Sequence, residues 1–239
     1  KKINIEGTSN IINVALSANI KKLGYVSSIA ALGRNSTNER VDEECYFKGT
    51  KLDSNYAFSK YYAEQEVWRG IAEGLDAVIV NPSVILGPGD WSKGSSKIFE
   101  KIYNGLRFYT SGSTGYVDVV DVAEACIKLL FSEIKNERFI LNGANLKYRD
   151  CFDRIAESFG KSKATIKVTP FLKEIAWRAE ALKSLITNKK PLITKETANS
   201  AMTNRMFSTK KIEQALDFKF TDINFTIKKY TEWFIADQA

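Results

Sequence analysis

Asn55-Tyr-Ala-Phe-Ser-Lys60 places a phenol and an ammonium one helical turn apart, and Ala77-Val-Ile-Val80 follows as a continuous apolar run. Residues four positions apart lie on one face of a helix, so the first stretch predicts a helix over residues 55–73 that ends at Gly74. An unbroken apolar run is typical of a parallel strand that is covered on both faces. Together, the two stretches predict a helix packed on a parallel sheet.

The alternation of helix and strand extends in both directions from these two stretches. Upstream, an apolar face predicts a helix over residues 4–23 with a stop at Lys22-Leu-Gly24, and residues 25–30 read as a short buried strand. Downstream, we expect strands over 116–121, 138–141 and 165–168, and helices over 96–104, 122–131, 150–159, 171–186, 212–216 and 225–234. This rhythm is typical of a doubly wound α/β sheet.

The chain contains no histidine, the commonest general acid–base side chain. A Ser-His-Asp triad, a Cys-His dyad and an H-E-x-x-H zinc site are therefore excluded. A phenol beside an ammonium is a substitute, because an unperturbed phenol titrates near pH ~10 and a neighbouring positive charge favours the phenolate. Only Tyr56 among the ten tyrosines has a lysine four residues later, which chance alone would also give. Its neighbours therefore decide its meaning.

The remaining composition is that of an ordinary globular protein, with 44% hydrophobic residues and a net charge of +7. No apolar run reaches the ~18 residues of a membrane span, and no secretory signal is visible, so we expect a cytoplasmic protein without a membrane span. Three widely spaced cysteines without C-x-x-C predict reduced thiols and no metal site. Lysines gather within 161–167 and 183–195. They predict a solvated basic face or attraction of a phosphorylated ligand, and no nucleic-acid motif accompanies them.

Five segments occur in a recognisable order. They are Asn4-Ile-Glu-Gly-Thr8, Val26-Ser-Ser-Ile-Ala-Ala-Leu-Gly33, Asn55-Tyr-Ala-Phe-Ser-Lys60, Asn81-Pro-Ser-Val-Ile-Leu-Gly-Pro-Gly89 and Tyr116-Val-Asp-Val-Val-Asp-Val-Ala123. In this order the segments resemble the extended short-chain dehydrogenase/reductase family, also called the NAD-dependent epimerase/dehydratase family. Each segment is a modest signal alone, but the resemblance covers nearly the whole chain.

The resemblance implies a role for several residues. Ser28 takes the position of the serine that orients the substrate, whereas Ser27 is the less favoured candidate and packs at a strand end. Tyr56 is the acid–base group, and Lys60 favours its phenolate form and binds the nicotinamide ribose of NAD or NADP. Pro82 and Ser83 present backbone beside the nicotinamide.

Two further residues receive weaker assignments from the resemblance. Asn4 matches an asparagine that supports a water relay, and capping of a helix is an equally good interpretation. Asp121 receives a structural role, as the cap of a helix that starts at Val122.

The chain departs from the family in one important respect. It contains no G-x-x-G-x-x-G, the turn whose backbone N–H groups bind the pyrophosphate at a helix N-terminus. The sequence opens on Lys1 near the family's fourth helix, so we expect a fragment of a longer protein rather than a chain that holds its cofactor alone. Half of a sheet would expose one apolar strand edge and face.

The resemblance implies a fold class and a division of the chain. We expect the C-terminal portion of a doubly wound Rossmann parallel sheet plus a small α+β cap that binds substrate. The core takes residues 1–88, with 116–145 returning to it, and the cap takes residues 89–115 and 146–239.

Within the family, two branches compete. Sugar-nucleotide epimerases and dehydratases place an arginine before the fifth segment to bind diphosphate, whereas this chain has Ser113-Thr-Gly-Tyr116 there. The fourth segment and the short tail resemble the dihydroflavonol-reductase-like and 3β-hydroxysteroid-dehydrogenase-like branch. That branch reduces a ketone or aldehyde of a small molecule, or oxidises the alcohol. A nucleotide-sugar epimerase or dehydratase stays open, as does a non-catalytic nucleotide sensor on the same fold.

The resemblance also implies a homodimer through the helices over residues 4–23 and 55–73. The sequence gives neither the substrate nor the direction of the reaction. It also leaves the choice between NAD and NADP open.

Overall fold

The computed structural model of the chain describes residues 2–33, 40–50, 53–187 and 195–238. The chain forms two compact units, and each is described by itself. Unit 1 comprises Lys1–Ile85, Gly115–Ala144 and Met206–Ile223, and unit 2 comprises Leu86–Thr114, Asn145–Arg205 and Asn224–Ala239. The segment 206–223, which the sequence assigned to the cap, belongs to unit 1.

Unit 1 is built on a parallel sheet. Its strands are β1 (Leu23–Val26), β2 (Ala77–Pro82) and β6 (Glu137–Leu141), in the order β1-β2-β6. The register pairs Val26 with Val80 and Val80 with Phe139. Every residue of the central strand β2 is buried, as its unbroken apolar run predicted.

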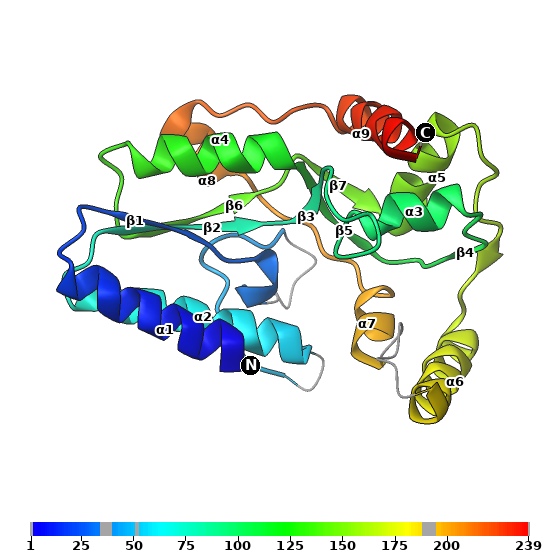
Figure 1. The fold of residues 1–239 in the computed structure, drawn as a ribbon, viewed down its shortest axis with the longest axis horizontal. Coiled ribbons are helices and arrows are strands. Elements are labelled where there is room, and N and C mark those ends of the chain that lie inside the picture. The colour runs from blue at the N-terminus through cyan, green and yellow to red at the C-terminus, as the bar shows by residue number, and fades with distance from the viewer. Residues whose placement is uncertain (1, 34–39, 51–52, 188–194, 239) are drawn as a thin grey trace. The chain divides into compact units, whose positions relative to one another are not determined.

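Helices cover both faces of this sheet (Figure 1). α1 (Lys2–Ser17) and α2 (Asn55–Ala72) pack on the face that carries Ile79. α4 (Val119–Leu130) and α8 (Lys210–Leu216) pack on the face that carries Val78 and Val80. Side chains alternate between the faces of a strand, so the single run in β2 serves two cores. The predicted doubly wound α/β class is confirmed.

The helix predicted over residues 4–23 ends earlier, at Ser17. Asn19 adopts the left-handed region with φ of 51°, a conformation that asparagine tolerates and that terminates helices. The chain then forms β1 over Leu23–Val26, so the strand starts and ends earlier than the predicted range of residues 25–30. After β1, the chain turns into a short 3₁₀ helix, η1 (Ile29–Ala31).

The cap of α4 is Asp118, and the prediction that Asp121 caps this helix is wrong. The Asp118 side chain accepts a hydrogen bond from the backbone N–H of Val120 at 2.8 Å. Asp121 lies in the first turn and accepts hydrogen bonds from the backbone N–H and the hydroxyl of Thr221 at 2.8 and 2.7 Å. Asp121 thus binds the segment that precedes α9 (Ile223–Gln238), a hundred residues further along the chain, and no local sequence pattern could have predicted this partner.

Unit 2 has an aromatic core. The rings of Trp91, Phe99, Tyr103, Phe159 and Phe234 contact one another with centroids 5.1 to 6.4 Å apart. The indole N–H of Trp91 donates to Asp237 at 2.8 Å. The helices of unit 2 are α3 (Lys97–Tyr103), α5 (Tyr148–Ser158), α6 (Pro170–Thr187), α7 (Lys195–Ser200) and α9 (Ile223–Gln238). Its strand β4 (Phe108–Tyr109) pairs with β8 (Ile166–Lys167).

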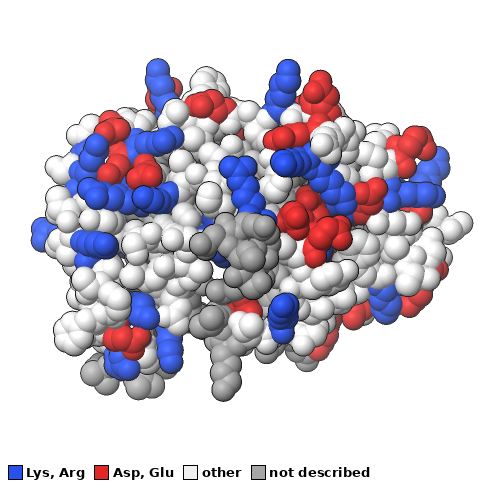
Figure 2. All heavy atoms as spheres, turned by 180° about the vertical axis from the view of Figure 1, so that it is seen from behind, with Lys and Arg blue, Asp and Glu red and all other residues white. Residues whose placement is uncertain are grey.

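A second small sheet has the order β3-β5-β7. Its strands are β3 (Val84–Leu86), β5 (Ser113–Asp118) and β7 (Ala144–Lys147). Figure 2 shows basic side chains interspersed with acidic ones over the face that it draws. Within the described ranges, no helix has the length and hydrophobicity that crossing a bilayer requires.

The contact between α1 and α2 yields a test. A Cβ added at Gly70 would lie 2.6 Å from Cγ2 of the fully buried Ile12, whereas a Cβ added at Gly7 meets nothing within 4 Å. Gly70→Ala should therefore lower the free energy of unfolding by about 1–3 kcal/mol through overpacking. Gly7→Ala should raise it by about 0.5–1 kcal/mol, because alanine loses less entropy in a helix. Urea unfolding followed by circular dichroism measures both, and equal effects would contradict this packing.

Candidate functional site

Three of the predicted site residues lie on two elements of unit 1 that pack together, η1 and α2. Ser28 follows β1, and its hydroxyl accepts a hydrogen bond from the N–H of Ala30 at 3.1 Å, capping η1. Tyr56 lies in the first turn of α2, which Ser54 caps by accepting from Ala57 at 3.0 Å. Caps at both elements therefore fix the backbone around the proposed reacting groups.

The Tyr56 side chain is 56% exposed. In the part of the chain that the structure describes, its hydroxyl makes no hydrogen bond. It is therefore available to an external oxygen. A phenol that is half exposed and held on a capped helix turn can both donate and accept a proton.

Lys60 lies one turn after Tyr56 and points to the end of β1. Its ammonium donates to the backbone carbonyl of Val26 at 3.1 Å and lies 5.4 Å from the centroid of the Tyr25 ring. Burial lowers the pKa of the Lys60 ammonium from its ordinary value, and the charge of Glu64 opposes that shift. The ammonium is thus fixed beside the segment that leads to Ser28.

Asn4 does not cap a helix, which corrects one of its two predicted roles. It lies inside α1, and its amide donates to the hydroxyl of Ser59 at 3.1 Å. That hydroxyl donates to the backbone carbonyl of Tyr56 at 2.8 Å. Asn4 therefore connects α1 to the helix turn that carries the phenol.

A buried carboxylate on α2, that of Glu64, accepts hydrogen bonds from side chains of several elements of unit 1. Glu64 is 0% exposed and lies one turn after Lys60. Its Oε2 accepts from the hydroxyl of Ser27 at 2.5 Å and from the amide of Asn81 at 2.8 Å. Its Oε1 accepts from Arg138 at 3.1 Å and from the indole of Trp68 at 3.4 Å. Side chains from the ends of β1 and β2 and from β6 thus meet on one residue of α2.

The sequence did not predict this network, and it offered Ser27 as the less favoured candidate for the substrate-orienting serine, packed at a strand end. An acidic residue four positions after Lys60 was the available signal. The Asn81 amide also donates to the backbone carbonyl of Ser28 at 3.0 Å. The network therefore reaches the backbone of the predicted substrate-orienting serine.

Arg138 extends the network toward the surface. It donates through Nε to the backbone carbonyl of Glu43 at 2.9 Å, and a second guanidinium nitrogen contacts the same oxygen. The Glu43 carboxylate accepts from the backbone N–H of Ile140 at 2.8 Å. Burial raises the pKa of the Glu43 carboxyl above its ordinary value, although the Ile140 N–H acts in the opposite direction.

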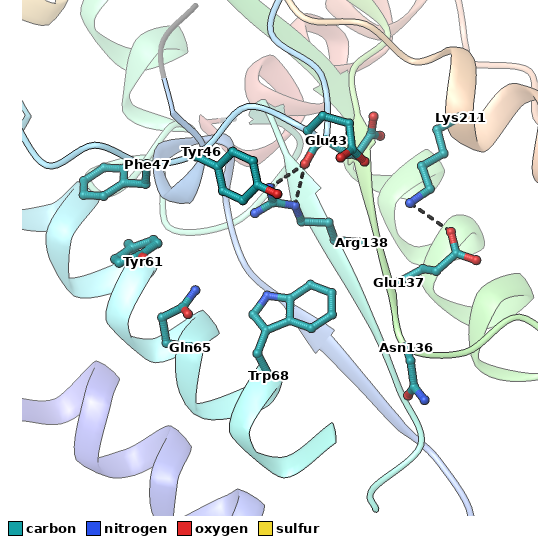
Figure 3. Close-up of a pocket in the computed structure, with 11 residues that line it drawn as sticks. Glu43, Tyr46, Phe47, Tyr61, Gln65, Trp68, Asn136, Glu137, Arg138 and Lys211 are labelled. Atoms are coloured by element: carbon teal, nitrogen blue, oxygen red, sulfur yellow. Dashed lines mark hydrogen bonds and ion pairs between the residues drawn. The ribbon is translucent and has the colours of Figure 1, made fainter. Parts of the chain in front are cut away.

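A hollow of 530 Å³ is lined by residues of α2, of β6 and of the segment that precedes α2 (Figure 3). Aromatic rings form much of one side, and Phe47 and Tyr61 stack there with centroids 4.6 Å apart. Its lining residues are Glu43, Glu44, Tyr46, Phe47, Tyr61, Gln65, Trp68, Asn136, Glu137, Arg138 and Lys211. None of the predicted site residues belongs to this lining.

The end of β2 carries groups that fit a bound nicotinamide. Asn81 and Ser83 are buried, and within the described chain neither Asn81 Oδ1 nor Ser83 Oγ has a hydrogen-bond partner. Pro82 between them ends the strand, and the Ser83 N–H donates to Leu141 at 2.9 Å. Buried acceptors without a partner are costly, so a ligand with amide N–H groups fits this position chemically.

These features define the chain as an α/β protein of the dinucleotide-binding class, with serine, phenol and ammonium near the carboxyl ends of its strands. Residues 1–141, more than half of the chain, match the NAD dependent epimerase/dehydratase family, and the chain belongs to this family. The resemblance drawn from the five sequence segments is confirmed.

The chain is similar to reductases within this family. A putative dihydroflavonol 4-reductase of Synechocystis is 27% identical over 97% of the chain and 69% of its own length. Cinnamoyl-CoA reductase 1 of Petunia hybrida is 28% identical over 75% of the chain and 58% of its own length. The crystal structure of gox2253 superposes with a TM-score of 0.81 at 29% identity, over 99% of the chain and 72% of that structure. The chain thus spans between about half and three quarters of these relatives.

The burial of Glu43 can be tested through the pH dependence of the free energy of unfolding. A carboxyl whose folded-state pKa is raised stabilises the fold below its unfolded pKa of about 4.3, and this contribution is lost as pH rises through the folded value. The free energy of unfolding of the wild type, measured against that of Glu43→Gln, should therefore be largest near pH 4 and decline toward neutral pH. Urea titrations at each pH measure this difference, and a difference that grows with pH would contradict the burial of Glu43.

Proposed function

We propose that the chain carries the Ser-Tyr-Lys chemistry of an NAD(P)-dependent oxidoreductase. It reduces a ketone or aldehyde of a small molecule, or oxidises the corresponding alcohol. The observation that carries this proposal is the arrangement of Tyr56 and Lys60 on α2, with a phenol that has no protein partner among the described residues and an ammonium fixed at the end of β1. The reductase relatives support the choice of reaction.

In this proposal the substrate carbonyl accepts hydrogen bonds from the hydroxyls of Ser28 and Tyr56. NAD(P)H, when bound, supplies the hydride to the carbonyl carbon. The proton that completes the alcohol comes from Tyr56, and the Lys60 ammonium stabilises the resulting phenolate until solvent reprotonates it. Oxidation runs through the same groups in reverse. Pro82 and Ser83 hold the nicotinamide ring, and Lys60 binds its ribose.

Tyr56→Phe tests the acid–base role in the complete natural protein. Loss of a positioned acid–base group costs about 10²–10⁴-fold in rate, so kcat should fall by that factor on whichever ketone or aldehyde of a broad panel the wild type reduces. Tyr62→Phe is the matched control, because Tyr62 is a 48% exposed tyrosine of the same helix. Turnover that survives Tyr56→Phe would contradict the proposed acid–base site, and a wild type that turns over no member of the panel would favour the nucleotide sensor.

A nucleotide-sugar epimerase or dehydratase is the second candidate on this fold. Such an enzyme must bind a diphosphate, for which the arginine fork is best suited, and Ser113-Thr-Gly-Tyr116 provides none. Heat denaturation of the purified protein followed by mass spectrometry should therefore release no UDP- or GDP-sugar. Its release would favour the second candidate.

We also propose a homodimer through α1 and α2. Ile3, Ile11 and Val14 are 88, 60 and 66% exposed, and their spacing places them on one face of α1. A second copy would remove this apolar face from water. Sedimentation equilibrium should give a dimer for the wild type and a monomer for Ile11→Glu. Ile127→Glu, an exposed site on α4, should leave the dimer intact. A wild type that is only monomeric would contradict the proposal.

A further inference from the structure

We propose that Glu64 is a positioning residue for the Ser28–Tyr56–Lys60 site. Its carboxylate fixes Ser27 and Asn81, and thereby keeps the ends of β1 and β2 at a constant spacing from the helix that carries the phenol and the ammonium. The inference rests on the proposed function for its catalytic consequence.

Glu64 lies on the same face of α2 as the proposed reacting groups. Tyr56, Lys60 and Glu64 follow one another at intervals of four residues, so they lie along one face of the helix. Tyr56 is half exposed, Lys60 is half-buried and Glu64 is fully buried. The same face therefore runs from the open end of the site into the core, and the carboxylate is its buried anchor.

The Glu64 carboxylate binds two side chains that are next to the proposed site in sequence. Ser27 precedes Ser28, and Asn81 precedes Pro82, so each anchored side chain is adjacent to a segment of the proposed site. A single oxygen, Glu64 Oε2, accepts from both anchored side chains, at 2.5 and 2.8 Å. The two strand ends, already joined by the bond from the Ser27 N–H to the Val80 carbonyl at 2.8 Å, are thus tied to α2 through one oxygen atom. In a buried, low-dielectric setting such bonds are stronger than in water.

The hydrogen bonds at position 64 require a carboxylate. Four donors converge on Glu64, namely the hydroxyl of Ser27 and N–H groups of Asn81, Trp68 and Arg138. An ionised carboxylate only accepts, through two oxygens. A glutamine of the same shape has one accepting oxygen, and its NH₂ group would face two of the donors. Glu64→Gln therefore keeps the volume and breaks the arrangement.

Glu64 also acts electrostatically on Lys60. The Lys60 ammonium lies 5.4 Å from the centroid of the Tyr25 ring and donates to the Val26 carbonyl. Among the described residues, Glu64 is the one carboxylate whose charge acts on the pKa of Lys60, and it opposes the effect of burial. Loss of the Glu64 charge should thus shift the titration of Lys60 to lower pH.

The experiment compares three variants with the wild type in the complete protein. Glu66→Gln is the matched control, because Glu66 lies two residues further along α2 and pairs with Arg69 at the surface. Glu64→Gln should lower kcat by about 10²-fold, the cost of a displacement of about 1 Å at a reacting group. Glu66→Gln should leave kcat unchanged.

The third variant separates positioning from stability. Glu64→Gln leaves the Arg138 guanidinium facing an amide, so the single variant is expected to be less stable. The third variant, Glu64→Met with Arg138→Met, replaces the pair by apolar side chains and should restore much of the free energy of unfolding. A positioning role predicts that kcat stays about 10²-fold low in this double variant, because methionine offers no oxygen to the donors of Ser27 and Asn81. Recovery of kcat together with stability would overturn the inference.

A second measurement does not depend on turnover. Acetylation of Lys60 by acetic anhydride, followed against pH by peptide mass spectrometry, should have its midpoint at lower pH in Glu64→Gln and at the wild-type pH in Glu66→Gln. If the midpoint moves but the wild type reduces no carbonyl compound, the positioning inference stands and the proposed function fails. If the wild type is active and both the midpoint and kcat are unchanged in Glu64→Gln, the inference is overturned.

Discussion

The buried carboxylate of Glu64 lies where α2 meets the ends of the parallel sheet, and it accepts four hydrogen bonds there. These bonds join α2, the helix that carries Tyr56 and Lys60, to the ends of β1 and β2 and, through Arg138, to β6. Breaking a buried pair by removing one partner typically costs about 3–5 kcal/mol, because the other charge is left without a partner. A pair of this kind contributes little net stability over an apolar core. Its physical consequence is a fixed geometry of the strand ends.

That geometry explains how a chain without histidine can carry proton chemistry. The phenol of Tyr56 is held by a capped helix turn, and the ammonium of Lys60 is tied to the last residue of β1. Both groups gain their role from position rather than from an unusual residue type. The strand that follows, β2, ends in a proline and in buried acceptors that lack protein partners within the described residues. In the proposed function, chemistry and cofactor contacts thus gather at the same ends of the parallel strands, as in doubly wound folds generally.

Local patterns predicted well what local forces determine. The helix over residues 55–73 and the apolar strand at Ala77 were readable because their periodicity is determined by burial on one or two faces. The end of α1 could not be predicted in this way, because the apolar pattern continues past the left-handed turn at Asn19. The candidate site divides in the same way. Tyr56 and Lys60 are one turn apart on a helix, whereas the partners of Glu64 come from as far away in sequence as Arg138.

The central claim is that a substrate oxygen is bound between Tyr56 and Ser28, above strand ends anchored by Glu64. A crystal structure of the complete protein with NAD(P)H and a ketone inhibitor tests this most directly. The account predicts the inhibitor oxygen within about 3.2 Å of both hydroxyls, with the bonds from Ser27 and Asn81 to Glu64 in place. An inhibitor oxygen bound away from Tyr56, or a Tyr56 hydroxyl bonded within the protein instead, would contradict it.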